Sequence, residues 1–287
     1  MKKKVGYHEK ETMAAWKRVT LTIILSILSV VFMLPIFIVF INSFKGKFFI
    51  SETPFELPNV ETFVGFTNYI DGVAKTGLIK AFQWSFLITI FSVVVIVIFT
   101  AMTAWYIDRV KSKITSGLYY LFVFSMIVPF QMVMFTMTKV ADSLGLTNPG
   151  GIIIIYLGFG AGLSVFTFCG FIKSIPLAME EAAMIDGCNP IQTFTRIVFP
   201  MLKPTAITVA ILNTMWIWND YLLPSLILDT EYSTIPMAVQ SLKGGYGSID
   251  MGAMMAMLVL AIVPIIIFYL CCQKYIIKGI AAGAVKG

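Results

Sequence analysis

Long apolar stretches constrain the fold of this chain more than any other feature of its sequence. A helix that crosses a bilayer needs roughly 20 mainly apolar residues, and six segments meet that requirement. They run from Val19 to Ser43, Ala81 to Ile107, Ile114 to Val140, Gly151 to Ile172, Thr205 to Leu228 and Met251 to Cys272. Only 13% of the 287 residues are charged, against about 25% in a globular domain. The sequence therefore predicts an all-α, polytopic membrane protein with six transmembrane helices, and it excludes a soluble enzyme.

Basic residues predict the orientation of these spans. Most of the 21 lysines and arginines fall on one side, in residues 1–18, 108–113, 173–204 and 273–287. Because lysine and arginine concentrate in cytoplasmic segments, we expect a multi-pass inner-membrane protein with both termini in the cytoplasm. The apolar stretch after Arg18 is too long for a cleaved signal peptide, so we expect a retained first helix.

The domain organisation follows from the same pattern. We expect a cytoplasmic amino-terminal segment at 1–18, a first transmembrane helix at 19–43 and an outer loop at 44–80. A five-helix core then covers 81–273 and contains a cytoplasmic loop at 174–204, and a cytoplasmic tail covers 274–287. We expect Pro35, Pro129 and Pro264 to lie inside spans, where neighbouring helices satisfy the freed carbonyls.

Several chemistries are absent from the sequence. There is no G-x-x-x-x-G-K-[ST] motif for ATP, and His8 is the single histidine, which leaves no Ser-His or Cys-His catalytic pair. The four cysteines are Cys169, Cys188, Cys271 and Cys272, and none is expected in an outer loop. We predict no catalytic residue, no metal site, no disulfide and no nucleic-acid partner. The glycine run Gly158–Gly162 is interpreted as helix packing.

The loop at 174–204 is the most informative segment. Pro176 suits a first helical turn, Gly187 suits the position just after a helix end, and Asn189 before Pro190 suits the start of a second helix. Pro200 and Pro204 then break the chain before the fifth span. The pattern predicts a helix, a glycine turn and a second helix. The residues alone leave two interpretations open, namely a docking helix for another protein and an interfacial helix lying on the membrane.

A family resemblance favours docking. Glu181-Ala182-Ala183, three residues, Gly187, nine residues and Ile197-x-Phe199-Pro200 resemble the EAA motif of binding-protein-dependent ABC importers, with Phe199 where leucine is usual. Trp218-Asn219-Asp220, Thr234-Ile235-Pro236 and the carboxy-terminal residues are similar to the maltose-permease class, in particular its MalG-like subunit. The resemblance implies the type I ABC importer permease (MetI-like) fold.

The resemblance also implies partners. The loop would couple to a separate ABC ATPase dimer, with ATP and Mg on that partner and no cofactor on this chain; the coupling residues would be Glu181, Ala182, Ala183, Asp186, Gly187, Ile197 and Pro200. The loop at 229–250 would contact an extracytoplasmic solute-binding protein through Gly244, Gly245, Tyr246 and Gly247, although a plain flexible turn is a comparable interpretation. A second permease subunit would complete the membrane part, and residues 278–287 would contact the ATPase.

Candidate residues for a translocation path are Gln131, Asn213, Asn219 and Asp220. A lone intramembrane carboxylate is costly unless it is paired or wet, so Asp220 either lines a path or holds structure by hydrogen bonding. We favour the structural role.

The function predicted from the sequence is import of a sugar, with an oligosaccharide favoured. The nearest alternative is an ABC permease for a polyol or a glycerol phosphate. An intramembrane enzyme would need paired acids or a histidine, and a secondary transporter would need internal repeats.

Overall fold

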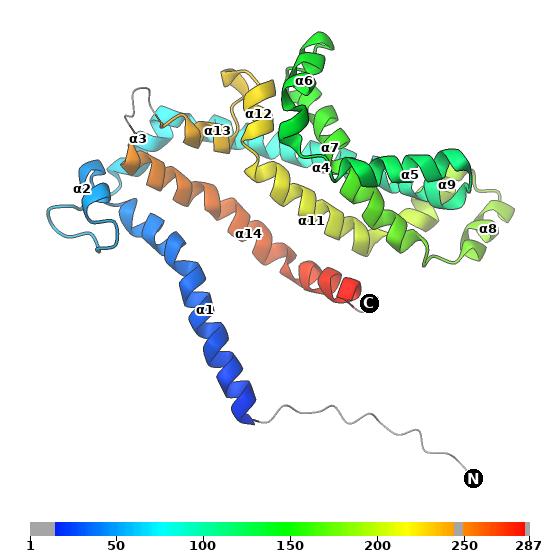
Figure 1. Ribbon diagram of the computed structural model, residues 1–287, viewed down its shortest axis with the longest axis horizontal. Helices are drawn as coiled ribbons and strands as arrows, with labels where there is room; N and C mark the ends of the chain where they lie inside the picture. The colour runs from blue at the N-terminus through cyan, green and yellow to red at the C-terminus, as the bar shows by residue number, and fades with distance from the viewer. Residues whose placement is uncertain (1–14, 244–248, 285–287) are drawn as a thin grey trace.

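Four long helices form the frame of the molecule. A computed structural model describes residues 15–243 and 249–284. Within those residues, four helices are long and apolar enough to cross a membrane singly: α1 (Ala15–Asn42), α4 (Leu78–Arg109), α7 (Pro149–Ile172) and α14 (Met251–Ala284). α4 and α14 run along the long axis of the molecule with α11 (Lys203–Asn219) between them (Figure 1). Pro35 and Pro264 lie inside α1 and α14, as predicted.

The third predicted span is a bent pair of helices, not the single continuous helix that the sequence analysis expects. Residues 114–140 form two helices, α5 (Lys113–Ser125) and α6 (Phe130–Ser143), which meet at 109°. Pro129 precedes α6 with extended backbone angles, φ −65° and ψ 138°. Proline lacks an N–H and disfavours helical geometry in the residue before it. The chain therefore turns at Pro129 instead of continuing a single helix.

The fifth predicted span is also divided. α11 ends at Asn219, Asp220 is extended with ψ 123°, and α12 (Leu222–Ile227) follows. Before α11 the chain bends by 78° from the short helices at 190–201. Four single helices and two bent pairs give up to six spans by length and composition among the described residues.

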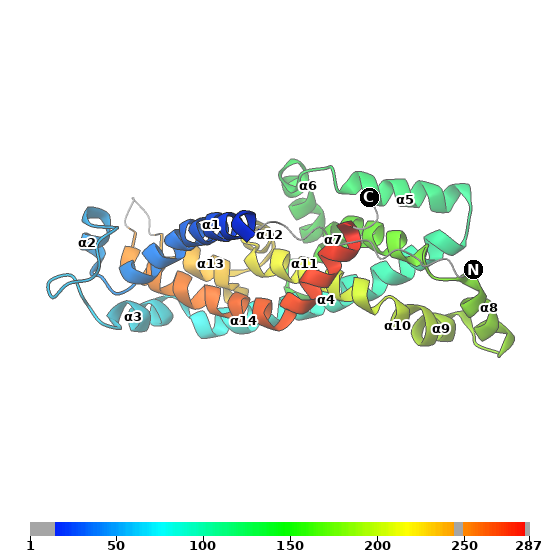
Figure 2. The same cartoon turned by 90° about the horizontal axis from the view of Figure 1, so that it is seen from below.

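One end of the molecule, called here the α3 end, is built from short elements. The predicted outer loop at 44–80 contains α2 (Lys47–Glu52) and α3 (Thr67–Thr76). The turn η2 (Thr230–Tyr232) and α13 (Ile235–Gln240) follow α12, and they pack on α4. Buried apolar side chains join this end to the long helices: Ala81, Ile235, Ala238, Val239, Leu242, Ala253, Ala256 and Met257. Figure 2 shows the same end from below, with α2 and α3 at its tip and α13 farther in, beside α14.

The central core lies between α4, α7 and α11. It buries Ile96, Val165, Phe168 and Val209 together with further aliphatic side chains. A Cβ added to Gly160 would lie 2.8 Å from the Ile96 Cδ1 atom and 2.8 Å from Asn213 Oδ1. This close approach supports the helix-packing interpretation at Gly160, whereas a Cβ added to Gly158 would have no atom within 4 Å.

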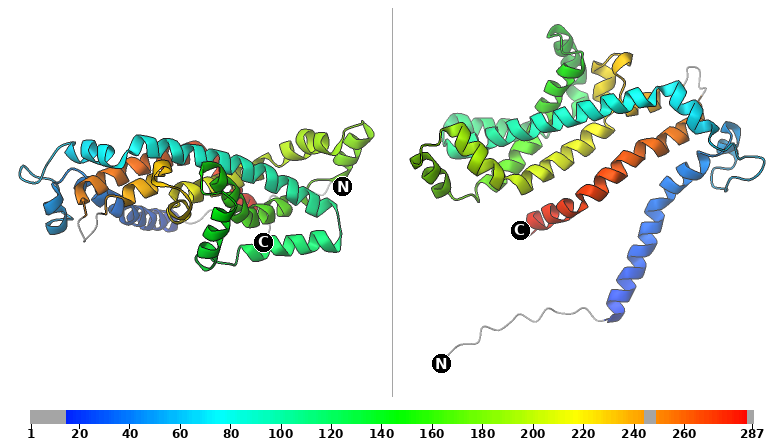
Figure 3. Two further views of the ribbon diagram at one scale, coloured as in Figure 1. Left: turned by 90° about the horizontal axis from the view of Figure 1, so that it is seen from above. Right: turned by 180° about the vertical axis from the view of Figure 1, so that it is seen from behind.

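α1 stands apart from this core. Residues 16–37 are all exposed, and α1 diverges from α14 after the two helices meet near α2 (Figures 1 and 3). An apolar helix exposed on every side needs lipid or another apolar surface around it. This arrangement agrees with a membrane-spanning first helix.

Candidate functional site

The 174–204 loop forms the opposite end of the molecule, called here the α8 end. α8 (Leu177–Ile185) follows Pro176, which lies just before the helix and not in its first turn. Gly187 has φ +86°, a left-handed conformation that a residue without a Cβ adopts at no steric cost. The Gly187 N–H donates to the Met184 carbonyl at 3.0 Å, and the Cys188 N–H donates to the Ala183 carbonyl at 3.0 Å. These two bonds form a Schellman cap, so the predicted glycine turn is confirmed.

The second helix of the loop begins where the sequence predicts. Asn189 Oδ1 accepts a bond from the Gln192 N–H at 2.9 Å, and Gln192 Oε1 accepts one from the Asn189 N–H at 3.0 Å. This reciprocal cap starts α9 (Pro190–Thr193), which continues through the π-helical turn η1 (Phe194–Val198) and α10 (Phe199–Met201) into α11. Ile197 is half-buried and Pro200 is exposed in this segment.

α8 has an exposed face and a buried face. Glu181, Ala182 and Asp186 are exposed, and Ile185 is 85% exposed. Ala183 is buried, so it lies on the other face of the helix. Figure 1 shows α8 projecting from the end of the molecule. The exposed face is therefore available to another protein, whereas the buried face packs on the chain itself.

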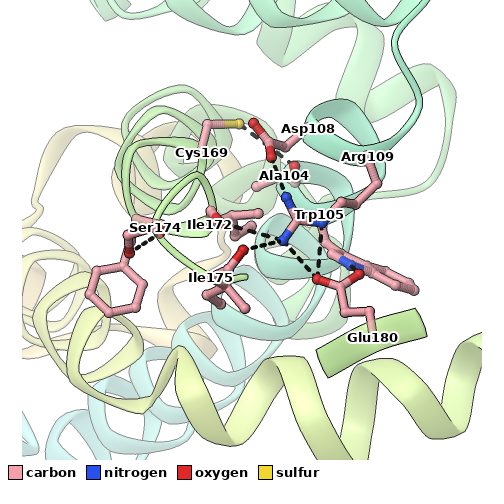
Figure 4. A network of polar contacts seen from close by, with 10 residues as sticks. Ala104, Trp105, Asp108, Arg109, Cys169, Ile172, Ser174, Ile175 and Glu180 are labelled. Carbon is pink, nitrogen blue, oxygen red and sulfur yellow. Dashed lines mark hydrogen bonds and ion pairs between the residues drawn. The ribbon is translucent and has the colours of Figure 1, made fainter. Parts of the chain in front are cut away.

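The buried face carries a residue that the sequence analysis missed. Glu180 is only 2% exposed. Its Oε1 accepts bonds from Arg109 Nε at 2.9 Å and Nη2 at 2.7 Å, and its Oε2 accepts one from Trp105 Nε1 at 2.8 Å. Figure 4 shows the three side chains converging between α4 and α8. A buried carboxylate is stable when it is paired and hydrogen-bonded, and both Glu180 oxygens have donors here.

Arg109 also joins α7 to this network. Its Nη2 donates to the Ile175 carbonyl at 3.1 Å and to the Ile172 carbonyl at 3.5 Å, just after and at the end of α7. Its Nη1 donates to Asp108 Oδ2 at 2.7 Å. In the sequence, Arg109 served only as an orientation signal. The adjacent glutamates at 180 and 181 could have indicated a buried carboxylate, because neighbouring residues on a helix point in different directions.

The four candidate path residues do not converge on one surface. Gln131 on α6 and Asn219 at the end of α11 are exposed. Asn213 is buried and donates to Ser164 Oγ at 3.2 Å and to the Val209 carbonyl at 2.9 Å. It holds α11 against α7 in this conformation.

Asp220 has structural partners. Its Oδ1 accepts a bond from the Leu222 N–H at 3.0 Å, which starts α12, and its Oδ2 accepts one from the buried Tyr156 hydroxyl at 3.0 Å. These contacts support the structural role favoured by the sequence analysis.

The residues predicted to meet a binding protein, Gly244, Gly245, Tyr246 and Gly247, lie outside the described residues. Lys243 and Ile249, which flank them, form an antiparallel bridge. The two ends of this segment are therefore adjacent at the α3 end.

The described residues form a bundle of apolar helices with a helical loop that projects at one end. This arrangement is typical of a multi-pass membrane protein. The described residues contain no evident catalytic centre. The chain belongs to the family described as binding-protein-dependent transport system inner membrane component, whose model matches residues 12–282. It is therefore an inner-membrane permease component of the ABC importer type, with the corresponding all-α fold.

Two relatives match nearly the whole chain. It is 38% identical to the "Probable starch degradation products transport system permease protein AmyC" of Thermoanaerobacterium thermosulfurigenes, over 93% of this chain and 96% of the relative. It is 36% identical to the "Multiple sugar-binding transport system permease protein MsmG" of Streptococcus mutans, over 94% and 96%.

A solved structure shares the fold. A chain of a bacterial ABC transporter involved in the import of the acidic polysaccharide alginate matches with a TM-score of 0.74 at 22% identity, covering 93% of this chain and 99% of that one.

Proposed function

We propose that the chain is one of the membrane-spanning subunits of an ATP-driven importer for a sugar, with an oligosaccharide as the favoured class. An extracytoplasmic binding protein delivers the sugar, and a separate ATPase dimer holds ATP and Mg. A second permease subunit completes the path across the membrane. The names of the two relatives, a permease for starch degradation products and one for multiple sugars, support the substrate class.

The observation that carries this proposal is the exposed face of α8. Glu181, Ala182 and Ile185 lie together on a short helix that is capped by Gly187 and projects from the body of the chain. The small side chain of Ala182 beside the charge of Glu181 allows another protein surface to approach closely. We propose that this face docks on the ATPase and that the α8 end, and with it both termini, lies in the cytoplasm.

Co-purification tests this proposal. The tagged chain is extracted from native membranes in mild detergent, and its partners are identified by mass spectrometry. We expect an ATPase, a second permease and a binding protein. Recovery of the chain alone, from membranes in which other complexes survive, would contradict the proposal.

A matched pair of variants tests the docking face. Ile185 is 85% exposed at the α8 end, and Ile70 is 70% exposed at the α3 end. Ile185→Asp is expected to reduce ATPase recovery at least about tenfold, since one lost interface anchor costs more than 1.4 kcal/mol. Ile70→Asp adds the same charge at the other end and is expected to leave ATPase recovery unchanged. Equal losses in both variants would show a general folding defect.

The substrate class is tested with the recovered binding protein. Its thermal stability is measured with maltotriose, raffinose, sorbitol and glycerol 3-phosphate. Stabilisation by a saccharide supports the proposal, because a ligand stabilises the folded state that binds it. Stabilisation by sorbitol or glycerol 3-phosphate alone would assign the importer to another solute.

A further inference from the structure

We propose that Glu180, Arg109 and Trp105 form a positioning site that locks α8 to α4 and α7, so that a displacement of α8 by the ATPase is passed to the membrane helices. This inference rests on the proposed function, because it assumes that α8 docks on an ATPase. It assigns a role to three residues that lie away from the exposed face of α8.

The network ties three helices at one point. Arg109 is the last residue of α4, Glu180 lies in the first turn of α8, and the Ile175 carbonyl lies between α7 and α8. One guanidinium therefore holds all three segments (Figure 4). Its planar fork of donors fixes direction as well as distance, and a second donor from Trp105 holds the other oxygen of Glu180.

Burial of the Arg109–Glu180 ion pair makes the attachment of α8 to α4 rigid. The side chains of Arg109 and Glu180 are 18% and 3% exposed. A charge pair removed from water keeps its geometry, because separating the partners leaves an unpaired buried charge. A push on α8 is therefore expected to move α4 and the end of α7 with it, instead of bending the loop.

The same contact decides which face α8 presents. Successive residues on an α-helix point about 100° apart, so Glu180 and Glu181 cannot face the same way. With Glu180 held inward by Arg109, Glu181 and Ala182 face outward. Loss of the inner contact would let α8 rotate and would misalign its docking face.

Trp105 also holds the other half of the loop. Its ring lies 5.5 Å from the ring of Phe194 in η1, and Phe194 lies 5.7 Å from Phe199 in α10. The last turns of α4 thus contact both the segment entering Gly187 and the segment leaving it. Both halves of the 174–204 loop therefore have a side-chain contact with the last turns of α4.

The test measures coupling in the complete complex. The transporter recovered with the native chain is reconstituted in proteoliposomes with its binding protein, and sugar uptake and ATP hydrolysis are measured together. The probe is the radiolabelled saccharide of the panel above that stabilises the binding protein most. Glu180→Ala and Arg109→Ala are expected to lower the sugar moved per ATP at least about tenfold in complexes that still contain the ATPase.

Two further variants separate positioning from folding. Trp105→Phe keeps the ring packing on Phe194 but removes the N–H donor, and it is expected to lower the ratio about threefold with little change in complex yield. The exchange Glu180→Arg with Arg109→Glu is expected to recover part of the loss seen in each single variant. A residue needed only for folding would lower complex yield and leave the sugar moved per ATP unchanged.

The outcomes are distinguishable. An unchanged ratio in fully assembled Glu180→Ala and Trp105→Phe complexes would overturn the positioning role while leaving the proposed function intact. The absence of an ATPase in the complex of the native chain would instead overturn the proposed function.

Discussion

At the α8 end, Arg109 and Glu180 form an ion pair whose side chains are 18% and 3% exposed, whereas at the α3 end Lys75 and Asp250 form one whose side chains are 52% and 28% exposed. Both pairs join segments that are distant in the sequence. The first pair is mostly buried and both oxygens of its carboxylate accept hydrogen bonds, while the second pair is more accessible to solvent.

The difference in burial between the two ion pairs indicates where an ion pair can stabilise the position of a segment. Exposed ion pairs contribute little to stability, because water and salt screen them. At the α3 end, apolar contacts join α3 and α13 to α4 and α14. At the α8 end, the 174–204 loop lies outside the helix bundle. The buried ion pair orients this loop, because charge-assisted hydrogen bonds are directional and apolar packing is not.

The largest predicted effect tests this contrast directly. Glu180→Ala leaves Arg109 buried without its main partner and is expected to destabilise the chain by about 3 kcal/mol. Asp250→Ala, at the exposed pair, is expected to lower the melting temperature by less than about 2 °C. Thermal unfolding in detergent, followed by circular dichroism, measures both. Similar decreases in melting temperature in the two variants would contradict the contrast between the buried and the exposed ion pair.

A second pair of variants compares two glycines that have left-handed backbone angles. Gly187 and Gly77 have φ +86° and +58°, and neither has atoms near an added Cβ. Valine at either position is expected to cost about 1–2 kcal/mol or more from backbone strain. Only Gly187→Val is expected to reduce binding-protein-stimulated ATP hydrolysis, by about tenfold. An equal reduction from Gly77→Val would show that strain at either end uncouples the complex.

Tyr156 and Asp220 provide an intermediate case. Tyr156 is fully buried and Asp220 half-buried, and the bond between them is 3.0 Å. Tyr156→Phe is expected to destabilise the chain by about 1.5 kcal/mol, as for a hydrogen bond to a charged group, with the KM for sugar uptake unchanged. A raised KM at undiminished stability would instead place the pair on the translocation path.

The smallest effect concerns pH at the α3 end. Burial alone would raise the pKa of Asp250, but hydrogen bonds from Lys75 and the Ala253 N–H, together with the charges of Lys75 and Lys47, outweigh burial and lower this pKa. A lowered pKa in the folded state gives stability above the unfolded value of about 3.9, and that stability disappears as pH falls through the folded pKa.

The difference in melting temperature between the native chain and Asp250→Asn is therefore expected to be small at pH 6 and to shrink further as pH falls below about 4. Lys75→Gln serves as the matched control, since it removes the same pair from the other side. A difference that grows on acidification would show that the pair does not stabilise the folded chain.

Much of the fold could be predicted from local sequence. The span positions follow from apolar length, and the start and end of the loop helices follow from Gly187, Asn189 and Pro190. Each of these signals acts within a few residues. The break at Pro129 was misjudged, because whether a proline kinks or ends a helix depends on what packs around it.

The sequence by itself determined that this chain spans a membrane repeatedly and carries a helix, a glycine turn and a second helix between two spans. Only the tertiary structure decided which of the adjacent residues Glu180 and Glu181 faces inward. Helical periodicity fixes the angle between two residues on one helix, but it leaves the rotation of the helix about its own axis undetermined. That rotation is set by Arg109 and Trp105, some 70 residues earlier in the chain, which local sequence patterns do not connect to α8.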